Sequence, residues 1–187
     1  MRLSAERTSP YRFFQFWLNT DDRDVVNYLK YFTFLPKGEI EALAEATVQR
    51  PEQREAQRSL ARVMTDTVHG PTALARAEQA TQALFGGDIS SLDAADIADV
   101  FAEVPASELP KSQLEGEGLA VLDLLVGTSL VKSKGDARRS ISEGGLSINN
   151  ARIQDPLQMV TVNDLLAGQF IVLRKGKKNY HLVRVLS

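Results

Sequence analysis

The chain has 187 residues, of which 43% are hydrophobic and 25% are charged, a composition that suits one large or two small globular domains. It contains no cysteine, which excludes disulfides, thiol nucleophiles and cysteine-based metal sites. No apolar run approaches the roughly 18–20 residues of a membrane span, and residues 1–7 hold no apolar signal core, so we expect a cytoplasmic protein without membrane contact.

Charge is unevenly distributed along the chain, although the formal net charge is only −2. Residues 1–118 contain 12 Lys and Arg against 19 Asp and Glu, whereas residues 119–187 contain 10 against 5. An acidic first part and a basic second part predict two units with different partners.

The first part of the chain shows helical periodicity. Ser9 and Pro10 are typical of a helix start, because serine caps a helix and proline is tolerated at the first helical position. Pro51 and Pro71 are expected to open further helices, and residues 92–104 form the last apolar helical stripe. We therefore predict an all-helical domain over residues 1–104.

The pattern changes after a segment that resembles a linker. Residues 105–118 contain two prolines, two glycines and several Ser and Glu, which predicts a linker. Beyond it, short helices are expected over residues 119–126 and 134–142. Strands are expected over residues 146–148, 170–173 and 180–185, with a turn at Asn149 and Asn150 because asparagine tolerates positive φ. The prediction is a small α+β domain over residues 119–187, and an α+β fold class overall.

Two cationic clusters lie in this second domain. One surrounds the start of the helix at 134–142 and the other surrounds a tight turn between two strands; the first contains Lys132, Lys134, Arg138 and Arg139, and the second Arg174, Lys175, Lys177 and Lys178. Each alone is more often a solvated helix face or a hairpin tip kept soluble by lysines. Two such clusters in one basic segment favour phosphate and RNA binding, and we expect all eight side chains to share one surface.

The order of helix, basic helix, Gly144-Gly145 and strand resembles the RNA-binding domain first named from small-subunit ribosomal protein four, here the S-four-type domain. The resemblance covers roughly residues 119–150. Ser140 replaces an aliphatic residue that the pattern usually has, and Asn150 replaces the usual turn glycine. Neither departure removes a cation, so both bear on local packing more than on RNA binding.

A second resemblance covers nearly the whole chain. The sequence TSPYRFFQFWLNTDDRDV over residues 8–25, followed by YLKYFTF over residues 28–34, is similar to the segment that follows the catalytic domain in bacterial tyrosyl-tRNA synthetases. The strings VHG at 68–70, LFGG at 84–87 and LRKGKKNY at 173–180 also match that family. The resemblance implies a helical anticodon-binding domain and an S-four-type domain that together bind the anticodon and long variable arm of tyrosine tRNA.

The catalytic signatures of that family are not in this sequence. Its HIGH-like and KMSKS-like motifs lie upstream of the matching segment, and neither occurs here. We therefore expect a C-terminal part of a synthetase that is inactive alone, needs no cofactor and is mainly monomeric. The resemblance implies a homodimeric parent that uses ATP, Mg and tyrosine and dimerises through its catalytic domain.

Other candidate sites are weak. Asp21 and Asp22 precede a helix, where capping is the better interpretation, and Asp24 could accept hydrogen bonds from an anticodon base. His69 and His181 are far apart in sequence and are expected to be structural. Two rival functions remain open: a ribosome- or rRNA-associated factor with an S-four-type domain, and an RNA-modifying enzyme with this domain appended.

Overall fold

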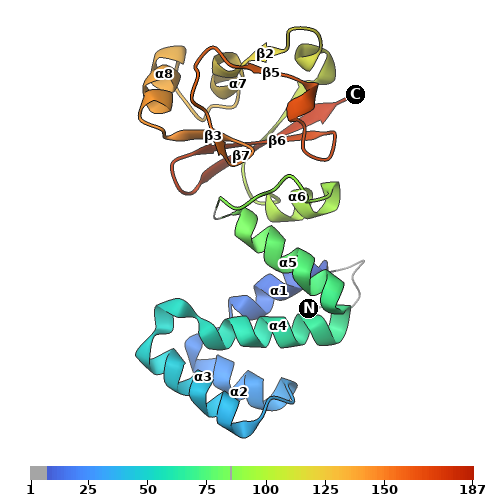
Figure 1. The fold of residues 1–187 in the computed structure, drawn as a ribbon, viewed down its shortest axis with the longest axis vertical. Helices are drawn as coiled ribbons and strands as arrows, with labels where there is room; N and C mark the ends of the chain where they lie inside the picture. The colour runs from blue at the N-terminus through green and yellow to red at the C-terminus, as the bar shows by residue number, and fades with distance from the viewer. Residues whose placement is uncertain (1–7, 85) are drawn as a thin grey trace. The chain divides into compact units, whose positions relative to one another are not determined.

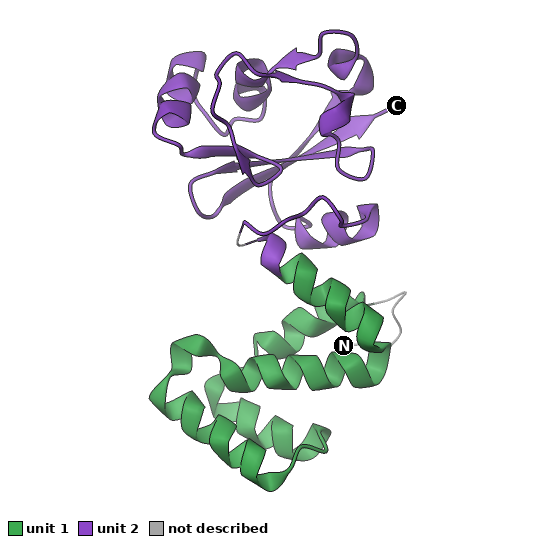
Figure 2. Cartoon of the chain, in the orientation of Figure 1, with its two compact units in different colours: residues 1–81 green, residues 82–187 purple. Residues whose placement is uncertain are grey.

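The computed structural model describes residues 8–84 and 86–187 and divides the chain into two compact units, Met1–Thr81 and Gln82–Ser187 (Figure 2). The first unit is helical and the second contains a mixed sheet with helices, so the predicted α+β class is confirmed. No helix in the described ranges is long and apolar enough to cross a membrane.

The first unit is built around one central helix (Figure 1). Its elements are α1 (Pro10–Leu18), α2 (Asp22–Phe32), α3 (Lys37–Gln49), the 3-10 turn η1 (Pro51–Gln53), α4 (Glu55–His69) and most of α5 (Pro71–Ala83). Helix α4 packs against α1, α2 and α3. The core between them contains Phe13, Trp17, Leu29 and Leu60, all buried.

Local capping explains where these helices begin. Ser9 caps α1 by accepting a hydrogen bond from the backbone N–H of Arg12 at 3.3 Å, and Pro10 follows it as predicted. Pro51 opens only a 3-10 turn, and α4 begins after Arg54, whose φ of 51° is left-handed. The continuous helix expected from Pro51 is therefore broken, because the guanidinium of Arg54 is held by the carbonyls of Leu18 and Thr20.

The second unit is a five-stranded sheet with helices on both faces (Figure 1). Its elements are α6 (Ala94–Val100), β1 (Ala106–Pro110), η2 (Lys111–Leu114), β2 (Leu119–Ala120), α7 (Val121–Gly127), α8 (Lys134–Ser142), β3 (Leu146–Ile148), β4 (Ala151–Arg152), β5 (Met159–Val160), η3 (Val162–Asp164), β6 (Phe170–Lys175) and β7 (Asn179–Leu186). The strand order is β1-β7-β6-β3-β4, with β1 parallel to β7 and the other pairs antiparallel. Strands β2 and β5 form a separate pair.

Strand alternation assigns side chains to the two faces of this sheet. Leu173 of β6 and Val183 of β7 join the core under α7 and α8. Arg174, which follows Leu173, and its cross-strand partner Tyr180 lie on the other face, where Tyr180 contacts Phe101 after α6 with 5.5 Å between ring centroids.

The segment expected to be a linker is part of the second unit. Strand β1 within it pairs with β7 from Ala106 to Pro110, and Leu114 is fully buried in the core. The prediction of a linker over residues 105–118 is thus wrong for these residues, because prolines at the ends of a short edge strand leave the sheet pairing intact. The boundary between the compact units instead falls near the end of α5.

When charges are counted on either side of the structural boundary, the two units no longer differ as the sequence analysis expected. Residues 1–81 carry 11 Lys and Arg against 11 Asp and Glu, and residues 82–187 carry 11 against 13. The acidic excess lies in residues 88–117, which hold eight Asp and Glu and one Lys. The basic segment and the acidic segment thus belong to one unit, and net charge does not distinguish the two units.

Candidate RNA-binding sites

Helix α8 presents the first predicted cationic cluster. Ser133 caps it by accepting from the backbone N–H of Asp136 at 3.2 Å, and Ala137 and Ile141 are buried against the core. Arg138 and Arg139 therefore face outward, where both are exposed. The helix spans the residues predicted from the sequence.

Asp136 joins this helix to the end of β6. One carboxylate oxygen accepts from the backbone N–H of Lys132 at 3.1 Å and from the Lys175 ammonium at 3.2 Å; the other accepts from the Arg139 guanidinium at 3.1 Å. The hydrogen bond from Lys132, followed by that from Lys175, lowers the pKa of Asp136. The carboxylate stays ionised at neutral pH and holds Arg139 and Lys175 together.

The other predicted cations differ in their pairing. Lys134 pairs with Asp123 of α7, whereas Lys132, Arg138, Lys177 and Lys178 are exposed and pair with no carboxylate of residues 8–84 and 86–187. Lys177 and Lys178 stand at the tip of the β6–β7 hairpin, beside Gly176 with its φ of +67°. We name the group Lys132, Lys134, Arg138, Arg139 and Lys175 the α8 surface.

Arg174 does not belong to the α8 surface. It lies on the opposite face of the sheet from Lys175, next to Ser147 of β3 and Tyr180 of β7. Its guanidinium is 3.5 Å from Ser147 Oγ and 3.4 Å from the Tyr180 hydroxyl. The expectation that all eight cations share one surface is wrong at this position, because consecutive strand residues point to opposite faces.

Asp24 lines a hollow in the first unit. The hollow has a volume of about 470 Å³ and is lined by Gln15, Phe16, Asn19, Thr20, Asp21, Asp24 and Tyr28. Phe16 is 52% exposed and Asp24 is exposed in the first turn of α2. Aromatic side chains beside free hydrogen-bond acceptors are what an unstacked RNA base requires.

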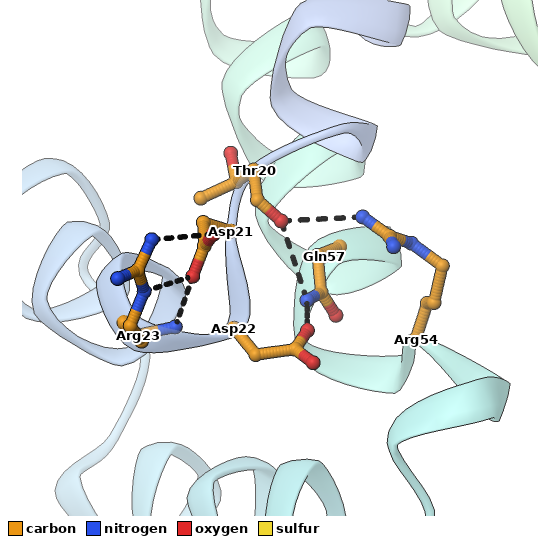
Figure 3. A network of polar contacts seen from close by, with 6 residues as sticks. All are labelled: Thr20, Asp21, Asp22, Arg23, Arg54 and Gln57. Atoms are coloured by element: carbon orange, nitrogen blue, oxygen red, sulfur yellow. Dashed lines mark hydrogen bonds and ion pairs between the residues drawn. The ribbon is translucent and has the colours of Figure 1, made fainter.

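The neighbouring aspartates are engaged in the fold (Figure 3). Asp21 caps α2 and accepts from the Arg23 guanidinium at 2.9 and 3.1 Å; this side-chain bond, together with the bond from the Arg23 backbone, lowers the pKa of Asp21 to about 2. Asp22 accepts from Gln57 Nε2, which also reaches the Thr20 carbonyl. The capping interpretation is confirmed for Asp21. Within the described ranges the Asp24 backbone N–H donates to the Asp21 carbonyl at 3.0 Å, but its carboxylate makes no hydrogen bond and is open to a ligand.

His181 is buried and His69 is half-buried. The His69 ring meets Phe13 edge-on with 4.8 Å between centroids, and His181 lies 3.0 Å from Ser107 Oγ. Burial lowers the pKa of each imidazole. Their surroundings agree with the structural roles expected for them, and within residues 8–84 and 86–187 no three His, Asp or Glu side chains gather as metal ligands would.

Comparisons with known proteins match both units. The model of class I tRNA synthetases (W and Y) matches residues 1–86, and that of the tyrosine–tRNA ligase SYY-like C-terminal domain matches residues 96–183. Tyrosine–tRNA ligase from Roseiflexus castenholzii is 53% identical over 184 residues, which are 98% of this chain and 43% of that protein. The chain belongs to the tyrosyl-tRNA synthetase family. The resemblance read from the sequence is confirmed.

The chain spans less than half the length of the tyrosine–tRNA ligases of Roseiflexus castenholzii and Bacillus velezensis. The ligase of Bacillus velezensis is 50% identical over 181 residues, which are 97% of this chain and 42% of that protein. A solution structure of a tyrosyl-tRNA synthetase C-terminal domain, 37% identical, covers 54% of this chain and 96% of that one with a TM-score of 0.42.

Three site residues were not found from the sequence. Asp136 organises the α8 surface, Arg152 adds a cation beside Arg174, and Asn150 binds the chain at and just after the end of α5. The Asn150 Nδ2 donates to the carbonyls of Ala83 and Gly87 at 2.8 and 2.9 Å. The replacement of a turn glycine by asparagine was the available signal, because glycine has no side chain to make these bonds.

Proposed function

We propose that this chain is the tRNA-binding C-terminal region of a tyrosine–tRNA ligase and that it binds the anticodon and long variable arm of tyrosine tRNA. The observation that carries the proposal is the α8 surface, where Asp136 brings cations from a helix and from the adjoining strand to one place. Arginine and lysine side chains so arranged suit a phosphate backbone.

The helical unit supplies base recognition in this proposal. Asp24 is the exposed acceptor of the 470 Å³ hollow, and Phe16 and Tyr28 offer aromatic faces on which a base can stack. Base edges read by an acceptor need no positive charge, so a helical unit with balanced charge fits this role. The α8 surface provides affinity that is largely independent of sequence.

In this proposal catalysis is carried out by a domain that corresponds to the part of the related ligases that this chain does not match. ATP, Mg and tyrosine would bind to a catalytic domain, which would also carry the contacts of a homodimer. The 187-residue chain alone is expected to be a monomer at micromolar concentration and to catalyse no tyrosine-dependent exchange of pyrophosphate into ATP. Analytical ultracentrifugation and an exchange assay on protein free of host synthetase test both statements.

The main rival is an rRNA-associated factor, and a competition experiment separates the two functions. Labelled tyrosine tRNA is bound to the 187-residue chain and displaced with unlabelled tyrosine tRNA, another long-armed tRNA or an rRNA fragment. We expect tyrosine tRNA to compete best, because in this proposal the hollow beside Asp24 recognises the anticodon of that tRNA. Better competition by the rRNA fragment would reject the ligase proposal, and equal competition by all three would leave only nonspecific RNA binding.

A further inference from the structure

A second cationic hollow lies on the sheet face opposite to α8. Its volume is about 510 Å³, and the cations that line it are Arg152 of β4, Arg174 of β6 and Lys177 of the hairpin tip. Among the described residues that line it there is no acidic side chain. Its position on the other face of the sheet separates it from the α8 surface.

The sheet register builds this site. Ser147 of β3 pairs with Arg152 on one side and with Arg174 on the other, so the three side chains lie in a row across adjacent strands. Such directly opposed residues have Cβ atoms about 4.5–5.5 Å apart. Arg152 and Arg174 thus flank Ser147 on one face of the sheet, and Lys177 lines the same hollow.

Arg174 is fixed in place without a counter-ion. Its guanidinium lies 5.8 Å from the centre of the Tyr180 ring, and the Tyr180 hydroxyl donates in turn to the Leu84 carbonyl at 3.0 Å. The two hydrogen bonds of Arg174, at 3.4 and 3.5 Å, are long, and its buried Nε has no partner in the part of the chain that the structure describes. A half-buried charge with neutral, distant partners retains most of its capacity to bind an anion.

The Arg152 guanidinium lies close to the backbone of Gly144 at the end of α8. Helix α8 ends in a Schellman motif, with hydrogen bonds from Gly144 N to the Ile141 carbonyl and from Gly145 N to the Ser140 carbonyl. A Cβ at Gly144, whose φ is +68°, would lie 2.5 Å from the Arg152 guanidinium carbon. The missing side chain lets Arg152 lie against the backbone at the edge of the hollow.

The two faces differ in their acidic neighbours. On the α8 surface Asp123 and Asp136 already pair with Lys134, Lys175 and Arg139. In contrast, Arg152, Arg174 and Lys177 form no ion pair within residues 8–84 and 86–187. An anion entering the second hollow therefore has no carboxylate to displace.

We propose that Arg152, Arg174 and Lys177 form a second phosphate-binding site for RNA, on the sheet face opposite to the α8 surface. The proposal rests on RNA binding as the proposed function and adds a second segment of phosphate backbone to it. The tip of the β6–β7 hairpin would then lie between two segments of RNA phosphate backbone, one on each side of the sheet. Arginine and lysine contact phosphates in this way without reading sequence.

Paired variants test this site on the 187-residue chain with tyrosine tRNA. Arg152→Gln/Lys177→Gln removes the two exposed cations, and Arg184→Gln is the matched control. Arg184 is exposed on the same sheet face and lies about 13 Å along β7 from Tyr180, outside the hollow. We expect the double variant to weaken binding about tenfold or more and the control less than twofold.

Phosphate ethylation interference identifies the phosphates that each site contacts. We expect Arg152→Gln/Lys177→Gln to remove interference at phosphates different from those lost in Arg138→Ala/Arg139→Ala. Unchanged affinity and salt dependence in the first variant, or loss of the same phosphates in both, would overturn the second site while RNA binding by the α8 surface stands. Absence of tRNA binding by the unaltered chain would overturn the proposed function as well.

Discussion

The Lys175 ammonium lies 3.2 Å from a carboxylate oxygen of Asp136, and this contact joins β6 to α8 at the centre of the α8 surface. The side chain of Asp136 is 17% exposed and that of Lys175 33%. An RNA phosphate that approaches Arg139 and Lys175 thus meets cations that are already paired with the Asp136 carboxylate. Asp136 aligns them, but its charge also opposes the phosphate.

Substitution Asp136→Asn separates these two effects. Asparagine can still accept from the Lys132 backbone, but it removes the negative charge and releases Arg139 and Lys175. We expect binding of tyrosine tRNA and of an unrelated structured RNA to tighten by similar factors of up to about fivefold, since exposed ion pairs contribute up to about 1 kcal/mol. Fluorescence anisotropy at several salt concentrations measures this. Weaker binding of both RNAs would mean that alignment by Asp136 outweighs its charge.

Asn150 binds the carbonyls of Ala83 and Gly87 within the second unit, and its removal should destabilise that unit. Asn150→Gly keeps the positive φ of 63° but loses the bonds to Ala83 and Gly87, so we expect a loss of about 1–3 kcal/mol. Asn150→Asp should cost more, because a carboxylate would face two carbonyl oxygens. Urea unfolding followed by NMR signals of β3 and β6 gives both values. Equal stability of all three proteins would show that these bonds contribute nothing net.

The Asn150 contact illustrates what the sequence could and could not predict. Helix α8 and the β6–β7 hairpin followed from local signals and are confirmed. Strand β1 was missed because Pro105 and Pro110 resemble loop punctuation, whereas its pairing with β7 depends on residues about 75 positions later. To predict that Arg174 and Lys175 face opposite sides, one needs to know the register of the sheet. To predict the site at Arg152, one needs to know that β4, β3 and β6 are adjacent.

The buried His181 should make the second unit sensitive to acid. Burial lowers its pKa in the folded state, so the unfolded chain binds the proton more readily. The stability that neutral His181 contributes is fully present above the unfolded pKa of about 6.5 and is lost as pH falls toward the folded pKa. His181→Gln should flatten this dependence. Amide hydrogen exchange in β6 and β7 between pH 5 and 8 measures it.

A control for the acid effect comes from the first unit. His69 also has a pKa lowered by burial, and Trp17, the single tryptophan, reports its unfolding by fluorescence. His181→Gln should leave the pH dependence of the Trp17 signal unchanged, whereas His69→Gln should reduce it. If His181→Gln kept the full pH dependence in β6 and β7, other groups would be responsible for it.

Asp24 should affect selectivity more than affinity for RNA in general. Asp24→Asn keeps the size of the side chain but replaces one acceptor oxygen with a donor, within the hollow that contains Phe16 and Tyr28. We expect tyrosine tRNA to bind about 10–100-fold more weakly, as for a lost hydrogen bond to a charged group, and an unrelated structured RNA to bind as before. Asp66→Asn, also exposed on a helix of this unit but outside the hollow, is the control. Equal loss for both RNAs would exclude base recognition by Asp24.

Arg138 and Arg139 should contribute affinity without selectivity. Both project from α8 into solvent, and only Arg139 is held by Asp136. If each contacts a phosphate, Arg138→Ala/Arg139→Ala releases fewer counter-ions on binding. The slope of log affinity against log salt should then flatten by up to about 0.9 per lost contact on a duplex and about 0.7 on a single strand. Binding of tyrosine tRNA and of an unrelated structured RNA should weaken by similar factors, in contrast to the effect of Asp24→Asn.

Titrations of both RNAs at four salt concentrations, with Arg62→Ala of α4 as the control for a lost surface charge, provide the slopes. An unchanged slope and affinity would show that the α8 surface is a solvated helix face, because a cation that contacts phosphate cannot be removed without changing the number of ions released.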